Sequence, residues 1–169
     1  MPIKNFNLII RKKISFFNKE ITVDSDKSLS IRSFLIGSIC QNISTANNVL
    51  ESDDVKSTIE ACRKLGVKII KIKPQTYKIY GKGLGSLHMK KNTEINFGNS
   101  GTLARLLIGI LSTNPNICIK IKGDHSLNKR NMRKLIDIMS KFGASFLPKQ
   151  KNTFPLKMIS SEIPSRNKI

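Results

Sequence analysis

The sequence has few acidic residues and no long apolar run. Only 11 of its 169 residues are Asp or Glu, against 30 Lys and Arg, so the formal net charge is +19. No apolar stretch reaches the roughly 20 residues that a membrane-spanning helix needs. Charged residues interrupt the first 20 positions too early for a signal peptide. We therefore predict a cytoplasmic protein without a membrane segment, long enough for an ordinary folded core.

Cysteine is also scarce, and its spacing excludes two classes of protein. Cys40, Cys62 and Cys118 are far apart and include no CxxC pair. Neither a disulfide framework nor a zinc site is indicated, and each cysteine is expected to pack as a small apolar residue. His88 and His125 lack acidic or cysteine neighbours at ligand spacing, so no metal site is predicted.

The positive charge admits three interpretations. It is compatible with nucleic-acid binding, with attraction of small anions, or simply with a composition rich in Lys, Asn and Ile. The lysines are spread along the whole chain, and aromatic residues make up only 6%. This distribution disfavours nucleic acid as a partner, and a small basic nucleic-acid-binding protein is kept as the alternative hypothesis.

Apolar spacing and capping residues predict four helices. They are expected at about Ser28–Ser38, Asp53–Leu65, Thr102–Leu111 and Asn131–Phe142. Ser52 is a suitable N-cap for the second helix. Gly66 and Gly143 are suitable residues to end the second and fourth helices.

Strands are predicted between these helices, which makes the fold α/β. The clearest are Val67–Lys73 and the alternating Ile117, Ile119 and Ile121. Shorter candidates are Ser44–Asn48, Tyr77–Tyr80, Glu94–Phe97 and Leu156–Ile159. Gly81, Gly83 and Gly85 indicate a loop.

An internal repeat divides the chain into two small units. SLSIRSFLIG followed by CRKLGVKII parallels GTLARLLIG followed by MSKFGASF, so that Arg32 corresponds to Arg105 and Gly66 to Gly143. Each copy reads helix, strand, helix, strand. We predict two α/β units, at residues 23–90 and 91–160, that share a core.

The repeat places residues suited to anions at two helix starts. Residues 26–28 precede Arg32, and residues 99–102 precede Arg105. A helix N-terminus offers free N–H donors and about half a positive charge. Lys27, Ser28 and Arg32 would add a charge, a hydroxyl and a guanidinium at the first start. At the second, Gly101 would let a ligand approach the backbone. The alternative is that Ser28 and Thr102 are ordinary caps and the basic residues are solvated.

A third polar cluster runs from Gly123 to Arg130. We predict that Arg130 stands at the N-terminus of the fourth helix, where the helix dipole disfavours a bare cation. A bound anion would relieve this repulsion. The alternative is a solvated surface arginine.

Four motifs resemble the enolpyruvylshikimate-phosphate synthase family. They are DKSLSIRSFLIGSI, LESDDVKSTIEACRKLGV, NFGNSGTLARLLIGIL and GDHSLNKRNMRKLIDIMSKFGA, in the family's order, from about Val23 to Ala144. The resemblance implies an enzyme of two domains, each built from three small α/β units with parallel inward helices. This chain would hold two of the three units of one domain. Residues 1–22 would belong to the opposite domain, and residues 161–169 would lie at a truncated end.

The resemblance also implies a reaction and its binding residues. The family transfers an enolpyruvyl group from phosphoenolpyruvate to shikimate 3-phosphate, without a metal or organic cofactor. Residues matching shikimate 3-phosphate contacts are Lys27, Ser28 and Arg32; those matching phosphoenolpyruvate contacts are Lys27, Asn99, Gly101, Thr102 and Arg130. The family's acid and base residues lie largely beyond this chain, so no catalytic residue is assigned. We expect the remainder of the enzyme to be a partner and the chain alone to be inactive.

Four residues at three places depart from the family pattern. Asp24 and Ser25 stand where Pro-Gly is usual, Asn131 replaces a proline, and Ile31 replaces a more polar residue. The first two changes each remove a proline, whose fixed φ would restrict the loops next to the expected site.

Overall fold

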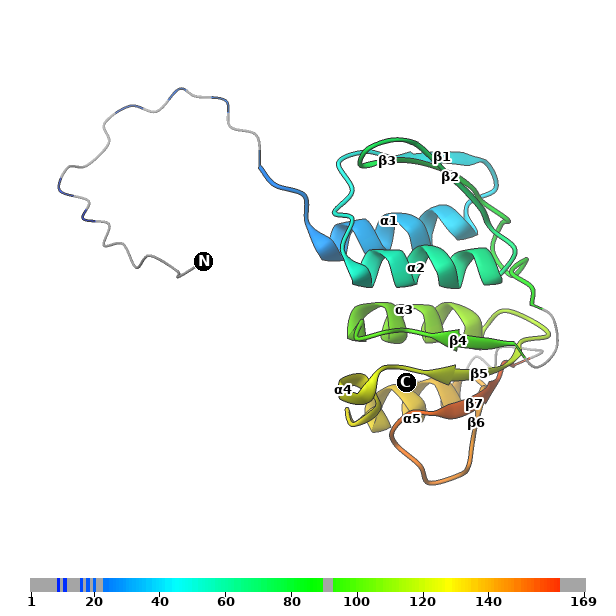
Figure 1. Ribbon diagram of the computed structural model, residues 1–169. Helices are drawn as coiled ribbons and strands as arrows, with labels where there is room; N and C mark the ends of the chain where they lie inside the picture. The colour runs from blue at the N-terminus through cyan, green and yellow to red at the C-terminus, as the bar shows by residue number, and fades with distance from the viewer. Residues whose placement is uncertain are drawn as a thin grey trace.

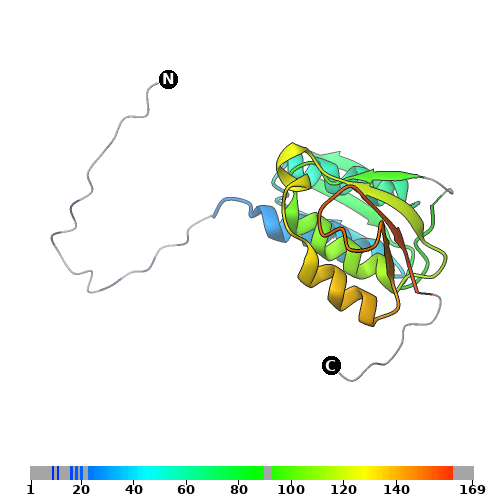
Figure 2. The same ribbon diagram turned by 90° about the horizontal axis from the view of Figure 1, so that it is seen from below.

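The computed structural model describes residues 23–89 and 93–161, together with residues 9, 11, 16, 18 and 20. Two small α/β units are stacked on each other (Figure 1), and the two longer helices of the second unit lie on one side of its sheet (Figure 2). The α/β prediction is therefore confirmed. The expectations for residues 1–22 and 162–169 fall almost wholly outside the described residues.

The first unit has two helices and a three-stranded sheet. Its elements are α1 (Lys27–Ile39), β1 (Ile43–Ala46), α2 (Asp53–Lys64), β2 (Lys68–Lys73) and β3 (Thr76–Tyr80). The sheet order is β1-β3-β2, and both pairings are antiparallel.

The second unit has a four-stranded sheet. Its elements are β4 (Glu94–Asn96), α3 (Gly101–Ser112), β5 (Cys118–Lys122), α4 (His125–Asn128), α5 (Arg133–Lys141), β6 (Ser145–Leu147) and β7 (Leu156–Ile159). The sheet order is β4-β5-β7-β6, with β4 and β5 parallel and the other pairs antiparallel.

The two units share one topology. The series α1-β1-α2-β2-β3 recurs as α3-β5-α5-β6-β7, and the order β1-β3-β2 recurs as β5-β7-β6. Gly66 and Gly143 follow the ends of α2 and α5 with φ of 83° and 93°, a conformation that glycine adopts without strain. The second unit differs by adding β4 and the short α4.

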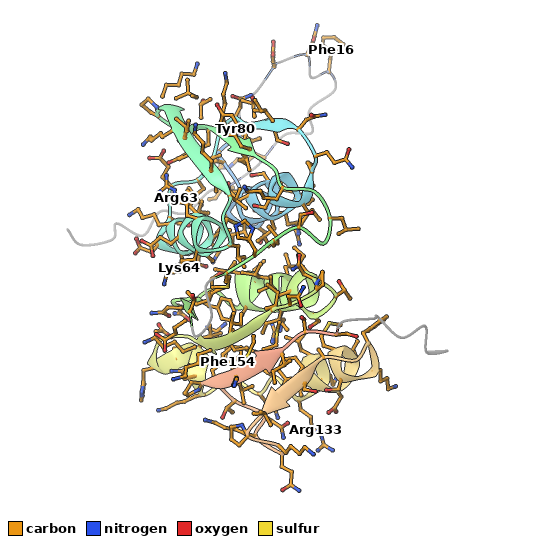
Figure 3. The ribbon with its side chains drawn as sticks, turned by 90° about the vertical axis from the view of Figure 1, so that its right-hand side faces the viewer. Phe16, Arg63, Lys64, Tyr80, Arg133 and Phe154 are labelled. Atoms are coloured by element: carbon orange, nitrogen blue, oxygen red, sulfur yellow. The ribbon has the colours of Figure 1, made fainter. Side chains whose placement is uncertain are left out.

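A single core joins the units. Ile31 and Phe34 of α1 and Leu103 and Leu107 of α3 are buried in one apolar cluster that includes residues of both sheets. At the edge of this contact, the Lys64 ammonium at the end of α2 donates to the Glu94 carbonyl at 3.0 Å. Figure 3 shows Lys64 at the end of α2, on the side nearer the second unit. The unit boundary is therefore a packed interface.

The helix boundaries correct two expectations. Ser52 is at the N-cap position of α2, but its buried hydroxyl has no hydrogen-bond partner. The fourth predicted helix begins at Arg133, two residues late, because the separate helix α4 precedes it and the Asn131 side chain accepts the Arg133 N–H in a turn.

The three thiols are free, as the spacing of the cysteines predicts. Cys62 is buried in the core, and burial raises the pKa of its thiol to about 11. Cys40 and Cys118 are half-buried. Among the residues that the structure describes, no helix combines the length and apolarity needed to cross a membrane.

Glu51 links the β2–β3 hairpin to the start of α2 and should make stability depend on pH. Its carboxylate accepts hydrogen bonds from Lys71, from the Tyr77 hydroxyl and from the Gln75 N–H, and these lower its pKa to about 2, with Lys71 the largest cause. A lowered pKa stabilises the fold above the ordinary value of 4.5, and this stabilisation is lost as the pH falls towards 2.

We therefore expect the free energy of unfolding to fall more between pH 5 and pH 2.5 in the natural chain than in a Glu51→Gln chain. Urea unfolding at several pH values measures this difference. Glu60→Gln, at an exposed position of α2, is the control and should follow the natural chain. Identical pH dependence in the natural and Glu51→Gln chains would contradict the assignment.

Candidate anion-binding site

The N-terminal ends of α1 and α3 open onto one cavity between the two units. The cavity has a volume of about 260 Å³ and is lined by Lys27, Asp54, Asn99, Gly101, Thr102, Arg105 and Arg130. The two helix starts that the repeat pairs thus contribute to one concave surface. We call this cavity the inter-unit cavity.

The first wall comes from α1 and α2. Asp26 caps α1 by accepting the Leu29 N–H at 2.6 Å, so the helix begins at Lys27. The Lys27 ammonium lies 3.0 Å from a carboxylate oxygen of Asp54, in the first turn of α2. The Lys27 side chain is 50% exposed and that of Asp54 is 19% exposed. Within the cavity lining, the lysine therefore connects the start of α1 to the start of α2.

The second wall is the loop that begins α3. Buried Ser100 caps this helix by accepting the Leu103 N–H at 3.2 Å. Next to it, the Asn99 amide oxygen accepts from the Arg130 guanidinium at 2.7 Å. A methyl group on Gly101 would lie 2.9 Å from the Arg130 Nη1. The absence of a side chain at Gly101 thus leaves room for the guanidinium to lie across the start of α3.

Arg130 reaches this place from a different position than the sequence predicts. It follows the short helix α4 and lies three residues before α5, so it is not at a helix N-terminus. Asp124 caps α4 by accepting the Leu127 N–H at 2.7 Å. The Asn128 side-chain amide accepts a hydrogen bond from the Gly123 N–H and donates one to the Gly123 carbonyl. These local bonds close a tight loop that directs the chain of Arg130 towards Asn99.

The charges around the inter-unit cavity are strongly unequal. Among the described residues of the lining, three cations, Lys27, Arg105 and Arg130, face a single carboxylate, that of Asp54. The sequence places Arg105 one turn into its helix, but it indicates Asp54 only as a first-turn residue of α2. Lys27 and Asp54 are far apart in sequence, so no spacing pattern connects them.

Two of the expected site residues do not line this cavity. Ser28 is half-buried and Arg32 is exposed on α1, and neither belongs to its lining. The caps also differ from the alternative interpretation: Asp26 and Ser100 cap the two helices, rather than Ser28 and Thr102. A neighbouring cavity of about 460 Å³ lies between residues 23–26, α1 and residues 45–49.

The sequence profile of one family, EPSP synthase (3-phosphoshikimate 1-carboxyvinyltransferase), matches residues 11–166. The chain belongs to the EPSP synthase family. Two curated relatives named 3-phosphoshikimate 1-carboxyvinyltransferase illustrate the similarity. That of Leptospira interrogans is 38% identical over 151 residues, covering 89% of this chain and 34% of the relative. That of Paramagnetospirillum magneticum is 36% identical over 143 residues, covering 85% and 32%.

The fold agrees with a solved EPSP synthase. The structure of the Acinetobacter baumannii protein matches 83% of this chain and 32% of its own, with a TM-score of 0.75 and 33% identity. The chain therefore spans about a third of the length of the EPSP synthases it matches. Most of each relative has no counterpart in these 169 residues.

Proposed function

We propose that this chain supplies one wall of the active site of an enzyme that transfers an enolpyruvyl group from phosphoenolpyruvate to the 5-hydroxyl of shikimate 3-phosphate. In the proposed reaction the 5-hydroxyl oxygen bonds to C2 of phosphoenolpyruvate and loses its proton, which the departing phosphate takes up in the overall balance, while C3 takes a proton. The C2–O bond to phosphate then breaks and C3 gives up a proton, so that free phosphate and the enolpyruvyl product remain.

The inter-unit cavity carries this proposal. It combines two helix starts, an arginine aligned by an amide and a lysine at its mouth, all of which favour a phosphoryl or carboxylate group. Both substrates carry such groups. Family membership supports the same conclusion independently, because the relatives named above carry out this reaction by name.

Within the proposal, the phosphoryl group of phosphoenolpyruvate lies in the inter-unit cavity. Asn99, Gly101 and Thr102 would contribute the start of α3, and Lys27 and Arg130 would hold the anion from either side. Preorganised donors of this kind stabilise charge that develops on a leaving phosphate. The role of this chain would thus be binding and electrostatic stabilisation.

Shikimate 3-phosphate would lie on the α1 side of Lys27. Ser28 and Arg32 are on the first two turns of α1, next to Lys27 but outside the inter-unit cavity. We propose that they bind the shikimate phosphate there and that Lys27 contacts both substrates. The proposed setting is the cytoplasm, which the three free thiols favour.

Removing Lys27 or Arg130 should weaken phosphoenolpyruvate binding selectively. A hydrogen bond to a charged group contributes about 1.5–3 kcal/mol, so Lys27→Ala and Arg130→Ala should each raise the dissociation constant about tenfold or more. Lys78→Ala removes an exposed charge from β3, away from the cavity, and is the control.

Calorimetric titration of the folded variants measures these effects. Equal losses in all three variants would indicate attraction by general basicity and would contradict a defined site.

A further inference from the structure

The Asp54 carboxylate is the one acidic group among the described residues that line the inter-unit cavity. It lies 3.0 Å from the Lys27 ammonium and shares the cavity with Arg105 and Arg130. An acidic side chain repels the anion that the rest of the lining attracts. Its place in this cavity therefore needs an explanation.

Stabilisation of α2 does not account for a carboxylate in the cavity lining. Asp53 and Asp54 both stand in the first turn of α2, where a negative charge favours the helix dipole. Asp53 is 97% exposed, pairs with Lys56 at 3.1 Å and lies outside the cavity lining. It gives the same benefit to the helix without facing the cations. Asp54 differs from Asp53 in its contact with Lys27 and in its burial.

We propose that Asp54 is the internal counter-ion of the inter-unit cavity. Its carboxylate holds Lys27 while the cavity is empty and gives up that ammonium, at least in part, to an incoming phosphoryl group. Because each bound anion must compete with the carboxylate, Asp54 sets the affinity for phosphorylated ligands below the value that three cations alone would give.

In the proposal, Asp54 also favours the release of phosphate. In the proposed reaction inorganic phosphate is a product, and three unopposed cations at a helix start would retain it. A resident carboxylate offers Lys27 a partner as soon as phosphate leaves. The inference rests on the proposed function only in taking the ligand to be a phosphorylated anion.

The test is titration of the 169-residue chain with inorganic phosphate, comparing the natural chain with Asp54→Asn and Asp53→Asn. Both substitutions remove one negative charge from the same turn of α2, so the second is a matched control. We expect Asp54→Asn to bind phosphate about fivefold or more tightly, because it removes one unit of close repulsion at intermediate dielectric. Asp53→Asn should stay within about twofold of the natural chain, since exposed charges are screened.

Three results would contradict the counter-ion role of Asp54. Unchanged binding in Asp54→Asn would overturn it, and weaker binding would show instead that the carboxylate holds Lys27 in place for the ligand. Absence of saturable phosphate binding by a folded Asp54→Asn chain would also overturn it. Asp54→Ala is the second variant if Asp54→Asn does not fold. The titration measures binding and no turnover. Its result can therefore be interpreted even if the chain takes no part in the proposed transfer reaction.

Discussion

The purified 169-residue chain is expected to release no phosphate from phosphoenolpyruvate and shikimate 3-phosphate. The inter-unit cavity is open, with Lys27 half-exposed and Asn99, Arg105 and Arg130 exposed. Water and salt therefore screen each contact that this wall makes. Protonation of C3 also needs an acid, which we expect in the part of the enzyme that this chain does not match.

Phosphate release is expected once the rest of the enzyme is added. The chain covers about a third of its relatives, so a second chain carrying the unmatched part of an EPSP synthase should close the site and exclude water. A phosphate-release assay on the 169-residue chain, on the second chain and on the mixture tests this expectation. Turnover by the 169-residue chain alone would show that the reaction needs fewer groups than we propose.

Replacing Phe97 by alanine is expected to be the most destabilising of the proposed changes. Phe97 is fully buried, directly after β4, and its ring lies 5.7 Å from that of Phe154. Its N–H also donates to the Lys122 carbonyl at 2.8 Å, which ties the end of β4 to β5. Loss of a buried phenylalanine ring costs about 3–5 kcal/mol. The free energy of unfolding of a domain is about 5–15 kcal/mol, so this substitution would remove a large part of it.

Thermal and urea unfolding measure the loss. Phe16→Ala is the control, because the Phe16 side chain is 81% exposed, and it should change stability by about 0.5 kcal/mol or less. Phe97 also anchors the loop that carries Asn99, so phosphoenolpyruvate binding should weaken even where the Phe97→Ala chain is still folded. A destabilisation below about 1 kcal/mol would contradict the burial of this ring in the core.

Local patterns predicted the elements of the fold well. Alternation in Leu156–Ile159 predicted β7 with its observed bounds, and Gly66 and Gly143 end their helices as expected. Such signals are contained within a few residues, because strand alternation and helix capping depend on neighbours in sequence. The duplicated pattern around Arg32 and Arg105 lies in α1 and α3, which begin the two series of elements with a common order.

The parts of the site that could not be predicted depend on contacts between segments that are distant in sequence. The position of Arg130 depends on the loop closed by Asn128 and Gly123 and on the amide of Asn99, and periodicity indicates neither bond. The pair formed by Lys27 and Asp54 joins two helices whose packing decides the contact. For the same reason, Ser28 and Arg32 share a helix with Lys27 but do not line its cavity.

The measurement that tests the central claim most directly is a phosphoenolpyruvate titration followed by the backbone amide resonances of the whole chain. The account predicts that the largest shifts occur together at Lys27–Leu29, at the start of α1, and at Asn99–Leu103, at the start of α3, and that they saturate with one dissociation constant. Shifts spread among surface lysines, or confined to one of the two helix starts, would contradict a shared anion site between the units.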